Sequence, residues 1–111
     1  MVQTRGRRRE YKDWGYYDPE EEHDPLIRKH IRQRPPGSGK NDPIIIGVSG
    51  HAYPAWSVYL QYLAAKRDTA RAAEEEYGND LTAEQIKAAV RFAKAYPDLV
   101  MPYVEPHLES A

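Results

Sequence analysis

The sequence predicts a mainly α-helical fold in which a short β-hairpin precedes three short helices. The first observation is that apolar residues recur at helical spacing in three separate stretches between residues 54 and 96. The second is that residues typical of helix caps lie in the tight connections between these stretches. The third is the run Ile44–Ile46 before a glycine-containing turn, which favours a strand and a hairpin.

The composition excludes several classes of protein. The 16 Lys and Arg against 17 Asp and Glu leave a net charge of −1, without the strong basic excess of an electrostatically driven nucleic-acid binder. With 111 residues and no cysteine, we expect one domain at most, without disulfides or thiolate chemistry, in the reducing cytoplasm. No apolar run is long enough to cross a bilayer, and the Arg-rich start lacks the apolar segment of a signal peptide.

Residues 1–43 are expected to comprise an extended N-terminal arm, a partner-binding segment and a linker. Residues 1–10 are basic and predict a disordered arm. Residues 11–25 mix aromatic with acidic residues and have too few aliphatic residues to fold alone. Residues 35–43 are a linker by composition. A phosphate-binding loop is not expected there, because residues required by that motif are missing and the run precedes a strand.

A short helix is predicted within this segment, over residues 24–34. Asp24 can cap it, and Pro25 suits the first helical position. Its apolar stripe comprises Leu26, Ile27, His30 and Ile31, opposite Arg28, Lys29 and Arg32.

Residues 44–111 are expected to form the helical domain with a C-terminal tail. The hairpin pairs residues 44–46 with residues 51–53, and a first helix follows over residues 55–66. A second helix over residues 70–77 ends at a Gly-Asn pair, which suits a left-handed stop. The inward face of the first helix comprises Val58, Tyr59, Tyr62 and Leu63.

The third helix is predicted over residues 83–95. Thr82 and Gln85 form a capping box at its start, and Pro97 ends it. Residues 101–110 hold two further prolines and are expected to lie extended against the body. The small core favours help from the hairpin or from a second subunit, so we expect a homodimer. The inward stripe comprises Ile86, Ala89, Val90 and Ala93, with Leu81 below it.

Several short sequence motifs follow one another in a characteristic order over about residues 42–96. They are a segment with Gly and Pro, a helix ending in acidic residues and Tyr, a Leu-Thr pair and an Ala-rich helix. The positions are Gly50, Tyr53, Pro54, Trp56, Glu74, Tyr77, Leu81, Thr82, Ile86, Ala88, Ala89, Phe92 and Ala93. In this order they resemble the bacterial family of unknown function numbered 433. His51 and Ala52 stand where the family has Thr-Arg, so this chain lacks the Arg that the family has there.

The resemblance implies a homeodomain-like helix-turn-helix bundle of three helices. It also implies an antitoxin of a toxin–antitoxin pair, which neutralises a PIN-like ribonuclease toxin and regulates transcription by binding operator DNA. The alternative is a protein–protein interaction module that has a helix-turn-helix shape and makes no DNA contact. An enzyme is not expected.

Three cations of the third helix could meet DNA. Lys87, Arg91 and Lys94 recur at helical spacing and share one face with Glu84. In a major groove these cations could contact phosphate or guanine, while Gln85 near the helix start could reach base edges. The other interpretation of this face is a solvated surface. Specific binding would need a dimer on two half-sites.

The N-terminal arm could add charge to this interface. Arg7, Arg8 and Arg9 could enter a minor groove, as arms of homeodomain-like proteins do. The alternative is that the arm only keeps the chain in solution.

The partner-binding prediction rests on aromatic residues. Trp14, Tyr16 and Tyr17 are large anchors of the kind found at interface hot spots. The alternative is that these aromatic residues pack onto the protein's own helices. The other predicted partner contacts are Ile27, Arg28, Ile31 and Arg32, whose arginines could pair with a carboxylate cluster.

No catalytic, cofactor or metal site is predicted. No two histidines have the spacing of a metal pair, and no cysteine is present. The serines lack the motifs that surround a nucleophile. The histidines are His23, His30, His51 and His107.

Overall fold

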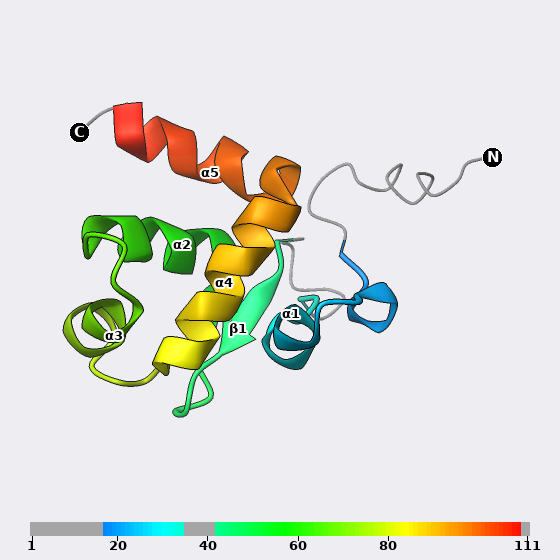
Figure 1. Cartoon of the computed structure of the whole chain (residues 1–111), viewed down its shortest axis with the longest axis horizontal. Helices are drawn as coiled ribbons and strands as arrows, with labels where there is room; N and C mark the ends of the chain where they lie inside the picture. The colour runs from blue at the N-terminus through cyan, green and yellow to red at the C-terminus, as the bar shows by residue number, and fades with distance from the viewer. Residues whose placement is uncertain (1–16, 35–41, 110–111) are drawn as a thin grey trace.

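The computed structural model describes residues 17–34 and 42–109, which fold into helices around one short hairpin (Figure 1). This confirms the mainly helical prediction with its hairpin, although five α-helices are present in these two ranges. Arg7, Arg8, Arg9, Trp14 and Tyr16 lie outside the described residues. The elements are η2 (Pro19–Glu21), α1 (Pro25–His30), β1 (Ile44–Ile46), β2 (Ala52–Pro54), α2 (Ala55–Ala64), α3 (Thr69–Arg71), η3 (Ala72–Glu76), α4 (Ala83–Ala95) and α5 (Pro97–Glu109).

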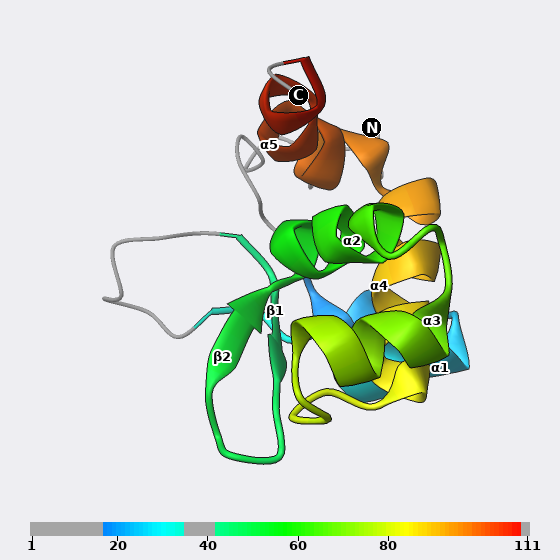
Figure 2. The same ribbon diagram turned by 90° about the vertical axis from the view of Figure 1, so that its left-hand side faces the viewer.

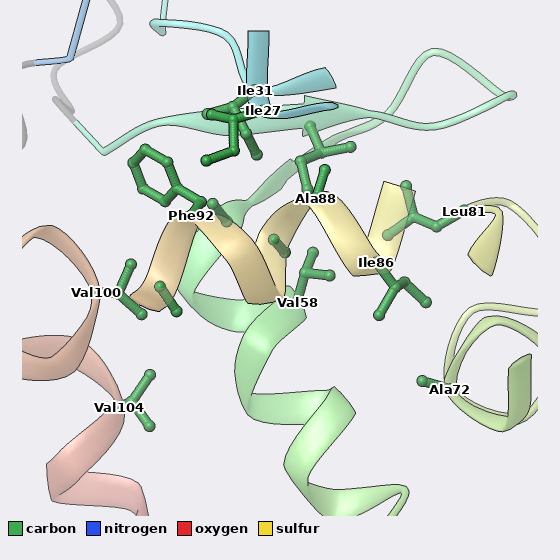
Figure 3. Close-up of a cluster of buried hydrophobic side chains, with 14 of the residues drawn as sticks. Ile27, Ile31, Val58, Ala72, Leu81, Ile86, Ala88, Phe92, Val100 and Val104 are labelled. Carbon is green, nitrogen blue, oxygen red and sulfur yellow. The ribbon is translucent and has the colours of Figure 1, made fainter. Parts of the chain in front are cut away.

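Helix α4 is the centre of the fold. It packs against α1, α2, α3, η3 and α5, and Figures 1 and 2 show it between these elements. The predicted inward stripe is buried, but Ala88 and Phe92 on its flank are buried as well. Ile27 and Ile31 lie over Phe92 and Ala88 and explain this second buried flank (Figure 3).

Helix α1 belongs to the same core as the later helices. The Asp24 carboxylate accepts hydrogen bonds from the Leu26 and Ile27 amides, and Pro25 takes the first turn, as predicted. The helix ends before the predicted residue 34. The chain becomes extended at Ile31, and Arg32 then forms a backbone bridge with Ile44.

The hairpin is short and antiparallel. Ile44 pairs with Pro54, Ile45 with Tyr53, and Ile46 with Ala52. Ile44 and Ile45 are both buried although neighbouring side chains of a strand point to opposite faces, so both faces of the hairpin are covered at its base. Ile46, near the turn, is 42% exposed.

Helix α2 begins and ends without side-chain caps. Pro54 precedes it and contributes no side-chain hydrogen bond. Beyond its last turn, Lys66 and Arg67 both have φ of 61°, the left-handed conformation that costs a residue with a Cβ about 1–2 kcal/mol. The next predicted helix is a short α-helical turn, α3, followed by a π-helical turn, η3.

The prediction of an extended C-terminal tail is wrong, because residues 97–109 form helix α5. Pro102 and Pro106 are four residues apart, so they lie on one face of the helix, and that face is exposed. Water can therefore satisfy the carbonyls that lose a partner at each proline. The other face buries Val100 and Val104 completely. None of the helices in the described ranges is long and apolar enough to span a membrane.

Candidate functional site

The exposed side of α4 is a narrow basic stripe, which we define as Lys87, Arg91 and Lys94. All three side chains are exposed, while the rest of the helix circumference is largely buried. At 3.6 residues per turn, the exposed sector spans roughly 100°. The basic stripe is therefore a ridge with little free backbone on either side.

Helix α1 runs antiparallel to α4 along one edge of the basic stripe. Arg91 Nη1 lies 3.1 Å from Asp24 Oδ1, near the start of α1. At the other end, Lys29 Nζ lies 3.1 Å from Glu84 Oε2, and His30 Nε2 lies 2.7 Å from the same oxygen. Hydrogen bonds with His30 and Lys29 hold the pKa of Glu84 below its ordinary value. The acids beside the stripe are thus already matched by cations of this chain.

Gln85 is not free to read bases. Its Oε1 accepts a hydrogen bond from the Thr82 amide at 2.9 Å, which completes the predicted capping box. Its Nε2 donates to the carbonyl of Ile46 at 2.9 Å. The side chain joins the start of α4 to the end of β1, and in this arrangement it does not reach outward as the predicted DNA contact requires.

The core takes three of the residues predicted to touch a partner. Tyr17, Ile27 and Ile31 are 4%, 1% and 0% exposed. The Tyr17 ring packs edge-on against Phe92 and Tyr96, with ring centroids 5.0 and 5.5 Å apart. For Tyr17 the alternative prediction of packing on the protein's own body therefore describes the structure. An enclosed side chain cannot also meet a partner.

The two arginines of the predicted partner surface remain exposed. Arg28 lies on the outer side of α1, and Arg32 Nη1 donates to the Arg28 carbonyl at 3.0 Å. Both arginines therefore remain accessible on the surface of this segment.

A buried carboxylate that the sequence did not reveal fixes the N-terminal segment. Glu22 is 7% exposed and accepts hydrogen bonds from the hydroxyls of Tyr17 and Tyr96, at 3.4 and 2.5 Å. Burial, together with the charge of Glu22, raises the pKa of Tyr17 well above its ordinary value. Glu22 belongs to an acidic run of the kind that normally faces water, so no sequence signal marked it.

Asp80 fixes the hairpin to the turn before α4. Its carboxylate accepts from the Tyr53 hydroxyl at 2.7 Å, the Ser49 hydroxyl at 2.8 Å and the Ser49 amide at 2.7 Å. These hydrogen bonds, that of Tyr53 first, hold the pKa of Asp80 below its ordinary value. A Cβ on Gly47 would lie 2.4 Å from Asp80 Oδ2, so this position has no room for a side chain.

A second buried carboxylate, that of Asp42, bonds to residues on both sides of the predicted linker. Asp42 is 8% exposed, and it accepts from Arg34 Nε at 2.9 Å and from Trp56 Nε1 at 3.2 Å. The Trp56 ring in turn stacks on Tyr103 of α5. The pair is structural, because both charges face each other rather than solvent.

The described part of the chain has no group of three or more His, Cys, Asp or Glu residues that could hold a metal ion. Comparison with family models, with curated proteins and with solved structures gave no match for this chain.

Proposed function

We propose that the chain is an antitoxin-type regulator that binds operator DNA with the basic stripe of α4. In this proposal η3, the turn after it and α4 act as a homeodomain-like helix-turn-helix. The observation that supports the proposal is the exposure of Lys87, Arg91 and Lys94 in one row, with Arg28 and Lys29 exposed on the adjacent helix. Rows of cations neutralise phosphates and release counterions.

The contacts would be to phosphates rather than to bases. The basic stripe extends about 10 Å along α4 from Lys87 to Lys94, at 1.5 Å per residue. Because α1 flanks the stripe, α4 cannot enter a groove deeply. Phosphate contacts position a protein on DNA but carry little sequence information. Base readout in this proposal falls to the arm residues Arg7, Arg8 and Arg9.

The ion pairs on this face do not prevent DNA binding. The Arg91–Asp24 pair is surface-exposed, with side chains 47% and 30% accessible. Exposed pairs of this kind contribute about 0–1 kcal/mol. Arg91 can therefore exchange the carboxylate for a phosphate at small cost.

The proposal assigns the PIN-like toxin to the N-terminal segment. Trp14 and Tyr16 would anchor it, and Arg28 and Arg32 would approach the acidic metal site of the nuclease. Two copies of the chain would be needed for two half-sites.

Gel shifts on the DNA upstream of the chain's own gene would test the proposal. The variant Lys87→Glu/Arg91→Glu should lose at least tenfold in affinity, because it removes two contacts and adds two repulsions. Lys66→Glu/Arg67→Glu, with the same charge change at the end of α2, should retain most of the affinity. Circular dichroism checks the fold of both variants. Equal affinity of both variants, or no binding by the wild type at low salt, would reject the DNA-binding proposal.

The second candidate is a protein interaction module without DNA contact. The uncharged surface of α2, which has no charged residue from Ala55 to Ala64, favours it. A wild type that binds the neighbouring gene product and no DNA would support this candidate.

A further inference from the structure

The middle cation of the basic stripe is paired with an acid of the chain's own α1. Arg91 Nη1 lies 3.1 Å from Asp24 Oδ1 and 3.4 Å from Asp24 Oδ2. In the described ranges, neither Lys87 nor Lys94 forms an ion pair. A carboxylate and a phosphate both offer acceptor oxygens to an arginine in this way. Asp24 therefore occupies the Arg91 group that a phosphate would need.

Contacts other than Arg91 hold the Asp24 carboxylate in this place. Its Oδ1 accepts hydrogen bonds from the amides of Leu26 and Ile27, at 2.9 and 3.4 Å, as the cap of α1. Helix α1 is itself fixed on α4 by Ile27 and Ile31, which are buried. The pair between Asp24 and Arg91 is exposed, and such pairs add little to stability. Its main consequence is therefore for what Arg91 can bind.

We propose that Asp24 is an autoinhibitory contact, which lowers the affinity of the basic stripe for polyanions by holding Arg91. This inference rests on the proposed function, in which the stripe binds the phosphates of DNA. To meet a phosphate, Arg91 must leave Asp24, and the carboxylate left behind must take up a cation from solution. A single small anion gains little, since it only replaces one anion by another. A duplex also meets Lys87 and Lys94, so the contact favours polyanions over isolated phosphate groups.

The variant Asp24→Asn tests the contact, because asparagine caps a helix about as well as aspartate but carries no charge. Its affinity for the DNA upstream of the chain's own gene should rise about threefold over the wild type, as expected for the loss of one exposed ion pair. The slope of log affinity against log salt should become steeper by about one, because Arg91 would then contribute the release of one further counterion. An unchanged affinity and an unchanged slope would overturn the inference.

The matched control is Asp68→Asn. Asp68 also caps a helix, since its carboxylate accepts from the Arg71 amide at 3.0 Å at the start of α3. Figure 1 shows α3 and α1 on opposite sides of α4. The control removes the same charge without freeing a cation of the basic stripe, so its affinity should stay within about 1.5-fold of the wild type in physiological salt. An equal rise in both variants would mean that only net charge matters.

A double-mutant cycle with Arg91→Gln shows whether Asp24 acts through Arg91. In the Arg91→Gln background, Asp24→Asn should raise the affinity no more than Asp68→Asn does. A rise of the same size with and without Arg91 would contradict the proposal. The variant Asp24→Ser also keeps a capping oxygen, and it replaces Asp24→Asn if the latter does not retain the helical circular dichroism of the wild type.

Elution from immobilised heparin separates this inference from the proposed function. Heparin is a polyanion without bases, and Asp24→Asn should elute from it at higher salt than the wild type and Asp68→Asn. If this order holds but the upstream DNA is not bound, the operator-binding proposal fails and the autoinhibitory contact stands. If the DNA is bound but the order is absent, the contact is refuted and the operator-binding proposal stands. A wild type that binds neither polyanion refutes both.

Discussion

Helices α2 and α4 pack on each other in one core, yet the residues that face away from the core differ between them in burial and in charge. Helix α4 is buried around most of its circumference and carries charge only on one row, with Arg91 paired to Asp24. Helix α2 is half-buried around most of its circumference and has no charge at all. Helix α4 begins with a complete capping box, whereas α2 begins without a side-chain cap.

The comparison shows that the buried residues of a helix and its exposed residues answer different questions: the first concern folding and the second concern binding. The buried faces of both helices explain how the chain folds. The exposed row of α4 suits a polyanion, whereas the uncharged side chains of α2 pack against the core and against α5. The following variants test whether the two helices differ in the way described.

The largest effect is expected for Phe92→Ala in α4. The Phe92 side chain is 0% exposed and packs edge-on against Tyr17. Its loss should lower the free energy of unfolding by about 3–5 kcal/mol, measured by urea denaturation. Lys87→Ala, five residues earlier on the exposed row, should change it by less than about 0.5 kcal/mol. Similar losses of unfolding free energy in the two variants would contradict a fold in which α4 is buried on most sides and exposed only along Lys87, Arg91 and Lys94.

A smaller effect is expected for Gly47→Ala, which tests how the start of α4 is fixed. The added Cβ would meet both the carboxylate and the backbone carbonyl of Asp80. The hairpin must then shift away from the turn before α4, at a cost of about 1–3 kcal/mol in thermal or urea unfolding. Val48→Ala, at the adjacent exposed position, is the control and should be close to neutral. A neutral Gly47→Ala would show that Asp80 does not hold the hairpin in place.

The smallest effect, of opposite sign, is expected at the end of α2. Lys66→Gly relieves a left-handed conformation that costs about 1–2 kcal/mol, while glycine loses about 0.5–1 kcal/mol in chain entropy. The net gain in unfolding free energy should be about 0.5–1 kcal/mol. Ala64→Gly, two residues earlier and still helical, should instead cost about 0.5–1 kcal/mol. Loss of stability in both variants would show that the left-handed end of α2 is not strained.

The sequence predicted α4 better than any other helix, because local residues determine its ends. Thr82 and Gln85 bond to each other's backbone within one turn, so no distant residue was needed to identify residues 83–95 as helical. The same local signal misled the site prediction. A glutamine near the start of a helix can serve the cap or a ligand, and Gln85 serves the cap and β1.

Helix α5 and the buried N-terminal segment could not be predicted in the same way. Pro102 and Pro106 argue locally against a helix, and only the fold shows that both face water. Val100 and Val104, four residues apart, were the signal for α5. For Tyr17 and Ile27, the surface that buries them belongs to α4, more than fifty residues later in the chain.

The bond between Glu22 and Tyr96 joins residues 74 positions apart. A ribosome releases residues 17–34 long before it has made α4, so Tyr17, Ile27 and Ile31 then have no surface to pack on. The first segment of the body therefore cannot close before α4 has been made. Folding of the N-terminal segment is thus coupled to the synthesis of α4, and a chain interrupted before Tyr96 would leave Ile27 and Ile31 without the surface that buries them.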